Sequence, residues 1–185
     1  VTSSVDGVRF PDNFCCLYAE DDKFLRTALP MRLFRKLGVA YDVAEDGAVA
    51  LELCRRRGRP YDVVLLDNQM PNVTGTDAAL ALRERGYKGI IIGMTGDPKG
   101  CPERRAFEAA GVDACVDKDR SGVEFVMGVL CACAHQAMES DAPPSSGATS
   151  DSGRGFGTSA RREDPVAKLS DAAYRAARQT ATRAA

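Results

Sequence analysis

The chain has 185 residues, 44% of them apolar, which is enough for one α/β domain with an appendage but argues against a second full domain. Its 25 basic and 26 acidic residues nearly cancel, so the charge balance argues against nucleic acid or an anionic membrane as a partner. The longest apolar stretch, residues 125–134, is far shorter than the roughly 20 residues that span a bilayer, and no secretion signal opens the chain, so we expect a cytoplasmic (intracellular) protein.

Short apolar runs alternate along the chain with longer segments of helical period, which predicts βα units and a parallel sheet. The expected elements, in chain order, are a strand at 14–19, a helix at 22–37, a strand at 39–44, a helix at 47–57, a strand at 62–66, a helix at 76–85, a strand at 90–94, a helix at 102–110, a strand at 112–116 and a helix at 121–138. The first, third and fourth strands are almost wholly apolar, as is typical of strands covered on both faces, whereas the second is more mixed and suits a sheet edge.

Two of the expected helices have unusual sequences. Pro30 lies in the middle of the helix at 22–37, where it removes the hydrogen bond to the Arg26 carbonyl and should kink or shorten the helix. The helix at 121–138 is apolar nearly all round, which we interpret as packing in the core rather than as a partner surface.

The composition changes sharply after the last expected helix. Residues 139–185 form a low-complexity tail, of which 139–163 is rich in Ser, Gly and Pro, and 166–183 is Ala-rich and is either a short helix or part of a solvated tail. Residues 1–12 are an N-terminal extension, which leaves 13–138 as the folded domain. Because the chain opens with Val1 and not Met, we expect a processed product or a piece of a longer protein.

The cysteine pattern predicts a reducing compartment. Seven cysteines are scattered without any CxxC pair or zinc-type spacing. Cys15 and Cys16 lie in an expected strand and most simply act as small buried apolar residues. Cys131, Cys133 and His135 resemble a ligand cluster, but helical positions two apart face nearly opposite directions, so we do not expect a metal site there.

Four of the expected strands end at polar residues. The strand at 14–19 ends at Glu20 and Asp21, and the strand at 62–66 ends at Asp67. The strand at 90–94 ends at Thr95, and the strand at 112–116 is followed closely by Lys118. In an open parallel sheet, ligands and chemistry lie at the carboxyl ends of the strands. These five side chains are therefore expected to share one edge of the sheet.

The residue types at this edge are suited to phosphoryl chemistry. Carboxylates crowded together either take up protons or recruit a cation, and an all-oxygen site is what Mg²⁺ accepts. A carboxylate such as Asp67 attacks phosphorus when the incoming charge is neutralised, and the product is an aspartyl phosphate. Mg²⁺ and the Lys118 ammonium would neutralise that charge, and Thr95 would donate a hydrogen bond to the phosphoryl oxygens.

Residues 13–138 resemble the response-regulator receiver domains of two-component phosphorelays. The resemblance rests on an acidic pair after the first strand, a D-x-x-M-P-x-x-x-G loop after the third, a Thr after the fourth and a Lys after the fifth, all in order and spacing. It implies a flavodoxin-like, doubly wound, five-stranded parallel sheet of order 2-1-3-4-5 with five helices. It also implies the following roles: Asp67 as phosphoacceptor, Glu20 and Asp21 as the acidic pair, the Gln69 backbone carbonyl as a further Mg²⁺ contact, Thr95 as the switch hydroxyl and Lys118 as the phosphate partner.

The resemblance also implies partners. The phosphoryl group would come from a histidine kinase or a histidine phosphotransfer protein, which would dock on the helix at 22–37 and the nearby loops. The segment Gln69-Met-Pro-Asn72 looks most like receivers of hybrid histidine kinases, so the chain is expected to belong to a larger sensor kinase or to be a single-domain regulator. A dimer partner or effector would use the surface formed by residues 102–138. No nucleic acid and no membrane contact are expected.

Two departures from the family pattern keep an alternative open. The family usually has an aromatic residue three positions before the Lys, where this chain has Cys115, and often a proline after the Lys, where it has Asp119. A pseudo-receiver, which would bind a protein without phospho-switching, is therefore the alternative function. A hydrolase with an aspartyl nucleophile is disfavoured because Gln69 stands where a general acid would be needed. We thus expect a phosphoacceptor domain rather than a turnover enzyme.

Overall fold

The computed structural model describes the backbone of residues 10–140 and the side chains of residues 10–134. Most of the expected N-terminal extension and almost all of the tail at 139–185, with its alternative helix at 166–183, lie outside the described residues.

Five parallel strands form one sheet in the order β2-β1-β3-β4-β5, as the resemblance implies. The strands are β1 (Cys15–Ala19), β2 (Ala40–Ala44), β3 (Val63–Asp67), β4 (Ile90–Thr95) and β5 (Ala114–Asp117). The mixed strand β2 lies at an edge, as its composition predicts, and the three apolar strands β1, β3 and β4 fill the centre. The order reverses between β1 and β3, and in open α/β sheets a ligand crevice lies at such a point.

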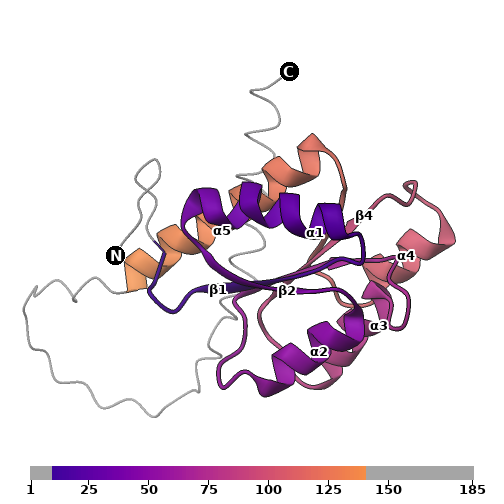
Figure 1. The fold of residues 1–185 in the computed structure, drawn as a ribbon, viewed down its shortest axis with the longest axis horizontal. Helices are drawn as coiled ribbons and strands as arrows, with labels where there is room; N and C mark the ends of the chain where they lie inside the picture. Colours follow the sequence, from indigo (N-terminus) through magenta and orange to yellow (C-terminus); the bar gives the residue numbers. More distant parts are fainter. Residues whose placement is uncertain (1–9, 141–185) are drawn as a thin grey trace, which may run out of the picture.

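The helices are α1 (Lys23–Pro30), which continues into the π-helical turn η1 (Met31–Arg35), α2 (Gly47–Arg56), α3 (Gly75–Glu84), α4 (Pro102–Ala109) and α5 (Arg120–Ser140). Two hydrophobic clusters lie on opposite faces of the sheet. One contains η1 and α5 side chains and the other contains α3 and α4 side chains, with α1 beside α5 and α2 beside α3 (Figure 1). The sheet is thus covered on both faces, which explains the apolar runs of its central strands.

Adjacent strand residues point into opposite clusters because the side-chain period of a strand is two. On β1, Cys16 and Tyr18 belong to the cluster under α5, while Cys15 and Leu17 belong to the cluster under α3. Both cysteines are buried, as predicted. The alternation matters for the site because it decides to which side of the sheet each residue at a strand end turns.

The segment around Pro30 remains helical. The regular α-helix ends at Pro30, as the missing N–H predicts, but the chain continues in a π-helical turn over Met31–Arg35 rather than breaking. The wider turn absorbs the lost hydrogen bond and still buries Leu33 and Phe34 against the sheet. Proline therefore changes the helix type and leaves the packing of this layer in place.

The apolar helix α5 packs into the core, as expected. Val123, Val126 and Leu130 are buried in the cluster on its side of the sheet, and Phe125 and Met127 pack partly buried against the same cluster. Within residues 10–140, no helix is long and apolar enough to cross a membrane.

Candidate functional site

The polar residues predicted to share an edge do lie together at the carboxyl ends of the strands. Glu20 and Asp21 directly follow β1, Asp67 ends β3, Thr95 ends β4 and Lys118 follows β5. Glu20, Asp67 and Thr95 are almost completely buried, whereas Asp21 is exposed. Buried ionisable groups are costly unless they are paired, so the partners of the two buried carboxylates define what the site can do.

Lys118 is the shared partner of the two buried carboxylates. Its Nζ lies 2.9 Å from Glu20 Oε2, donates a hydrogen bond of 3.0 Å to Glu20 Oε1 and lies 2.8 Å from Asp67 Oδ1. The Tyr18 hydroxyl donates a further hydrogen bond of 2.7 Å to Glu20 Oε2 from inside the core. Burial lowers the pKa of the Lys118 ammonium, but its contacts with Asp67 and Glu20 outweigh burial and hold that pKa above its ordinary value.

Asp67 is less well satisfied than Glu20. The contact between Lys118 Nζ and Asp67 Oδ1 is an ion pair without hydrogen-bond alignment, and Oδ1 is a buried oxygen that accepts no hydrogen bond. Burial raises the pKa of the Asp67 carboxyl to about 6, the Glu20 carboxylate adds to the rise, and Lys118 and the Gln69 backbone N–H oppose it. Near neutral pH the carboxyl is still mostly ionised. Its negatively charged Oδ1, which accepts no hydrogen bond, is therefore available to bind a cation.

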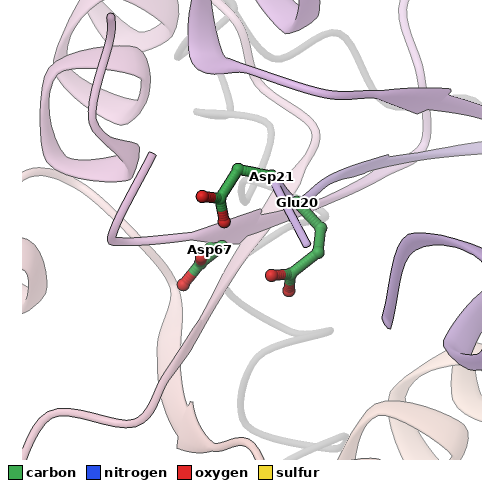
Figure 2. A group of neighbouring side chains, drawn as sticks. All are labelled: Glu20, Asp21 and Asp67. Atoms are coloured by element: carbon green, nitrogen blue, oxygen red, sulfur yellow. The ribbon is translucent and has the colours of Figure 1, made fainter. Parts of the chain in front are cut away.

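Three carboxylates are close enough to hold one ion. Glu20, Asp21 and Asp67 each offer an oxygen, and these oxygens lie within 4.8 Å of one another, the one such group among the residues with described side chains (Figure 2). Hard oxygen donors with net negative charge suit Mg²⁺, which typically binds through one or two carboxylates and keeps several waters. The unsatisfied Asp67 Oδ1 fits this reading, and the role of the Gln69 backbone carbonyl stays a prediction.

The loop after Asp67 is held close to the sheet by a glycine. A Cβ built on Gly75 would lie 2.1 Å from the Asp67 carbonyl oxygen, so only glycine lets the start of α3 approach this strand end. The Gly75 N–H donates to the Asn68 carbonyl at 3.0 Å. The final Gly of the D-x-x-M-P-x-x-x-G loop is thus required sterically, because it allows the end of the loop to pack against the proposed phosphoacceptor.

Two further side chains hold the loops that carry the carboxylates. The buried Asp46, which caps α2, accepts hydrogen bonds from the backbone and side-chain amides of Asn72 at 2.9 and 3.2 Å. Arg26 on α1 donates to the backbone carbonyls of Glu20 and Asp21 at 2.7 and 2.9 Å. The sequence gives no clear signal for the contact between Asp46 and Asn72, because it joins loops of two different βα units, whereas the Arg26 contacts lie within the β1–α1 unit.

A buried acid that the sequence reading missed lies beside Thr95. Asp97 accepts hydrogen bonds from the Thr95 hydroxyl at 2.8 Å, from Asn68 Nδ2 at 2.9 Å and from Gln69 Nε2 at 2.6 Å. The hydrogen bond from Asn68, followed by those from Thr95 and Gln69 and by the Arg104 charge, holds the pKa of the Asp97 carboxyl below its usual range. Its position two residues after a strand-end threonine was the available signal.

The two departures from the family pattern have local structural partners. Asp119 immediately precedes α5, and its Oδ1 accepts hydrogen bonds from the Gly122 N–H at 2.9 Å and the Ser121 hydroxyl at 2.7 Å, so it caps this helix. Cys115 is partly buried on β5 and packs against the cluster that contains Phe107 of α4. Burial raises the pKa of its thiol to about 11, which makes it a neutral packing residue.

Comparison with known proteins agrees with this arrangement. A rice protein (Oryza sativa subsp. japonica), two-component response regulator ORR42, is 37% identical over 107 residues, which cover 57% of this chain and 77% of that protein. Hybrid signal transduction histidine kinase B of Dictyostelium discoideum is 38% identical over 71 residues, which are 38% of this chain and 4% of the kinase.

Among solved structures, a CheY-like response regulator receiver domain protein from Methanospirillum hungatei JF-1 superimposes with a TM-score of 0.58 at 17% identity, covering 68% of this chain and 98% of that one, a likeness that concerns the fold alone. The family model of the response regulator receiver domain matches residues 16–127. This chain therefore belongs to the response regulator receiver domain family of two-component signalling.

Proposed function

We propose that this receiver domain accepts a phosphoryl group on Asp67 from a phosphohistidine donor, with Mg²⁺ held by Glu20, Asp21, Asp67 and the Gln69 backbone carbonyl. The observation that carries the proposal is the buried Asp67 carboxylate, which has one oxygen without a hydrogen bond and lies beside both an ammonium and two further carboxylates. That combination suits a group that must gain both a cation and a phosphoryl group.

The proposed step moves the phosphoryl group from a nitrogen to an oxygen. An oxygen of the Asp67 carboxylate attacks phosphorus, a P–O bond forms, and the P–N bond to the donor imidazole breaks. The imidazole nitrogen keeps the electron pair and takes a proton from solvent, so neutral histidine leaves. Bound Mg²⁺ would neutralise charge on the phosphoryl oxygens, as metal ions do in phosphoryl transfer generally.

Residues of this chain have separate tasks in that step. Lys118 forms the ion pair with Asp67, and its ammonium would pair with a phosphoryl oxygen once Asp67 has given up its charge. The Thr95 hydroxyl would donate to another phosphoryl oxygen. Both side chains are placed by the ends of neighbouring strands, so they need little rearrangement.

The donor would dock on α1 beside the carboxylates. Phe24 and Met31, seven residues apart and therefore on about the same side of this helical segment, are 76% and 47% exposed. Phe24 lies in the first turn of α1, three residues after Asp21 of the proposed metal site. A histidine kinase, a histidine phosphotransfer protein or a sensor kinase that contains this domain would cover these apolar side chains as it presents its phosphohistidine.

Incubation with acetyl phosphate and Mg²⁺ tests the proposal. We expect an intact-mass increase of one phosphoryl group, labile to hydroxylamine, on the wild type and none on Asp67→Asn. A second arm uses a phosphorylated histidine phosphotransfer protein, from which Phe24→Ala should accept phosphate several-fold more slowly while it reacts normally with acetyl phosphate. The exposed Leu80→Ala on α3 is the control for loss of a surface apolar group. A wild type that takes up no phosphate from either donor would leave the pseudo-receiver alternative.

A further inference from the structure

Asp97 is the hydrogen-bond partner of the Thr95 hydroxyl in this structure. The hydroxyl donates to Asp97 Oδ2 at 2.8 Å, and the same hydroxyl oxygen accepts from the Asp97 N–H at 3.0 Å. A hydroxyl has one hydrogen to donate. Thr95 therefore cannot donate to Asp97 and to a phosphoryl group on Asp67 at the same time.

Asp97 is in turn joined to α4 through an arginine. Arg104, whose side chain is only 3% exposed, donates to the Asp97 backbone carbonyl at 3.1 Å. The same guanidinium bonds to the carboxylate of Asp117 and donates to the Cys115 carbonyl at 3.3 Å. One buried side chain from α4 thus joins the loop after Thr95 to the edge strand β5.

The site at which the family usually has its mobile aromatic residue is filled from α4. In the register of the sheet, Cys115 of β5 pairs with Gly93 of β4. A Cβ built on Gly93 would lie 2.5 Å from the ring of Phe107, which is fully buried. The two small residues leave the room that this ring occupies, and Cys115 has no ring that could turn inward.

We propose that Asp97 is the resting partner of Thr95, which the phosphoryl group displaces, and that Arg104 carries the displacement to β5 and α4 in place of an aromatic switch. The proposal rests on the proposed phosphorylation of Asp67. A phosphoryl group attracts the hydroxyl and repels the Asp97 carboxylate, so Thr95 turns away and residues 95–97 move. Arg104 follows through its bond to the Asp97 carbonyl and changes its contacts with Cys115 and Asp117.

Backbone amide NMR signals of the full chain test the relay, with intact mass measuring phosphate on Asp67 in the same samples. After acetyl phosphate and Mg²⁺, we expect the wild-type signals of Thr95 and of residues 115–117 to shift together. In Arg104→Gln, Asp67 is phosphorylated to the wild-type extent and Thr95 still shifts, but the shift at 115–117 falls to less than half. Arg105→Gln, an exposed neighbour on α4, behaves as the wild type.

A phosphate-free arm tests the same connection independently. Asp97→Ala frees the Thr95 hydroxyl, so the signals of Thr95 and of residues 115–117 are displaced before any phosphate is added, and the second displacement is lost when Arg104→Gln is added. Arg104→Lys, which keeps the charge, is used if Arg104→Gln unfolds.

The outcomes separate this proposal from the proposed function. A wild type whose mass never changes overturns phosphorylation, and the relay with it. A phosphorylated wild type with unmoved signals at 115–117, or an Arg104→Gln protein with wild-type shifts there, overturns the relay alone.

Discussion

At the scale of single residues, the site combines buried negative charge with one shared ammonium. Glu20 has both oxygens occupied by Tyr18 and Lys118, whereas Asp67 has an oxygen without a hydrogen bond. The difference is consistent with the roles proposed for them, Asp67 as phosphoacceptor and Glu20 as a supporting carboxylate. It also makes Asp67 the residue whose ionisation should influence the stability of the fold.

Replacing Asp67 by Asn should stabilise the metal-free protein in a pH-dependent way. The pKa of this carboxyl is raised to about 6 in the folded chain. A raised carboxyl pKa favours folding below the unfolded pKa, and that contribution is lost as pH rises through the folded pKa. With about 1.4 kcal/mol per pKa unit, the free energy of unfolding of the wild type should fall on the order of 2 kcal/mol between about pH 4 and pH 7 relative to Asp67→Asn.

Urea denaturation in EDTA at a series of pH values measures this difference. Asp12→Asn, which removes an exposed carboxylate, controls for the loss of one charge. Parallel profiles for the wild type and Asp67→Asn would show that the buried carboxylate is fully compensated by its neighbours.

At the scale of elements, the sequence was sufficient for the strands and insufficient for the contacts between units. Each strand begins and ends within two residues of its predicted bounds, because continuous apolar runs between polar strand ends are a strong local signal. The π-helical turn after Pro30 depends on what Leu33 and Phe34 bury against, and the Asp97–Arg104 connection joins β4, α4 and β5. Neither leaves a periodic pattern in the sequence, so both had to come from the packed structure.

The junction between β3 and α3 is a specific test at this scale. Gly75→Ala puts a Cβ 2.1 Å from the Asp67 carbonyl oxygen, so the start of α3 must move away from the proposed phosphoacceptor. Forcing extra volume into a packed position costs about 1–3 kcal/mol, and we expect a loss of that order together with slower phosphorylation of Asp67. Thermal unfolding and the rate of phosphate uptake from acetyl phosphate measure the two effects.

Gly96→Ala is the matched control for this substitution. Gly96 follows Thr95 at the same edge of the sheet, but a Cβ there meets nothing within 4 Å. Its stability should stay close to wild type. If Gly75→Ala also kept the wild-type stability and rate of phosphate uptake, the close approach of α3 to Asp67 would not be needed for the fold or for the site.

At the scale of the whole molecule, one end of the sheet carries almost all the buried charge and the two hydrophobic clusters carry the packing. The clusters hold the strands in place, and the strands hold ionisable groups at distances that a free chain would not tolerate. The stability of the domain should therefore depend on which cations occupy that end, and Lys118 is the side chain whose cation pairs with both Glu20 and Asp67.

Lys118→Ala should fold but lose stability in EDTA, and Mg²⁺ should restore more stability to it than to the wild type. The lysine bridges two buried carboxylates, so its removal leaves both without this counter-charge and costs about 3–5 kcal/mol. A more negative site binds a divalent cation more tightly, and at Mg²⁺ concentrations above the Kd each tenfold fall in the Kd adds about 1.4 kcal/mol of stability. The variant should nevertheless respond poorly to phosphorylation, because the cation does not replace the ammonium that pairs with the phosphoryl group.

Urea midpoints in EDTA and in Mg²⁺ for the wild type, Lys118→Ala and Lys99→Ala decide this point. Lys99, 80% exposed and 3.7 Å from Asp117, controls for the loss of one lysine from the same region. An equal Mg²⁺ gain in all three proteins would mean that the ion binds away from the Glu20, Asp21 and Asp67 carboxylates. A larger Mg²⁺-induced gain in stability in Lys118→Ala alone would show that the ion and the ammonium bind the same carboxylates. Only at a shared site does removing the ammonium make Mg²⁺ bind more tightly.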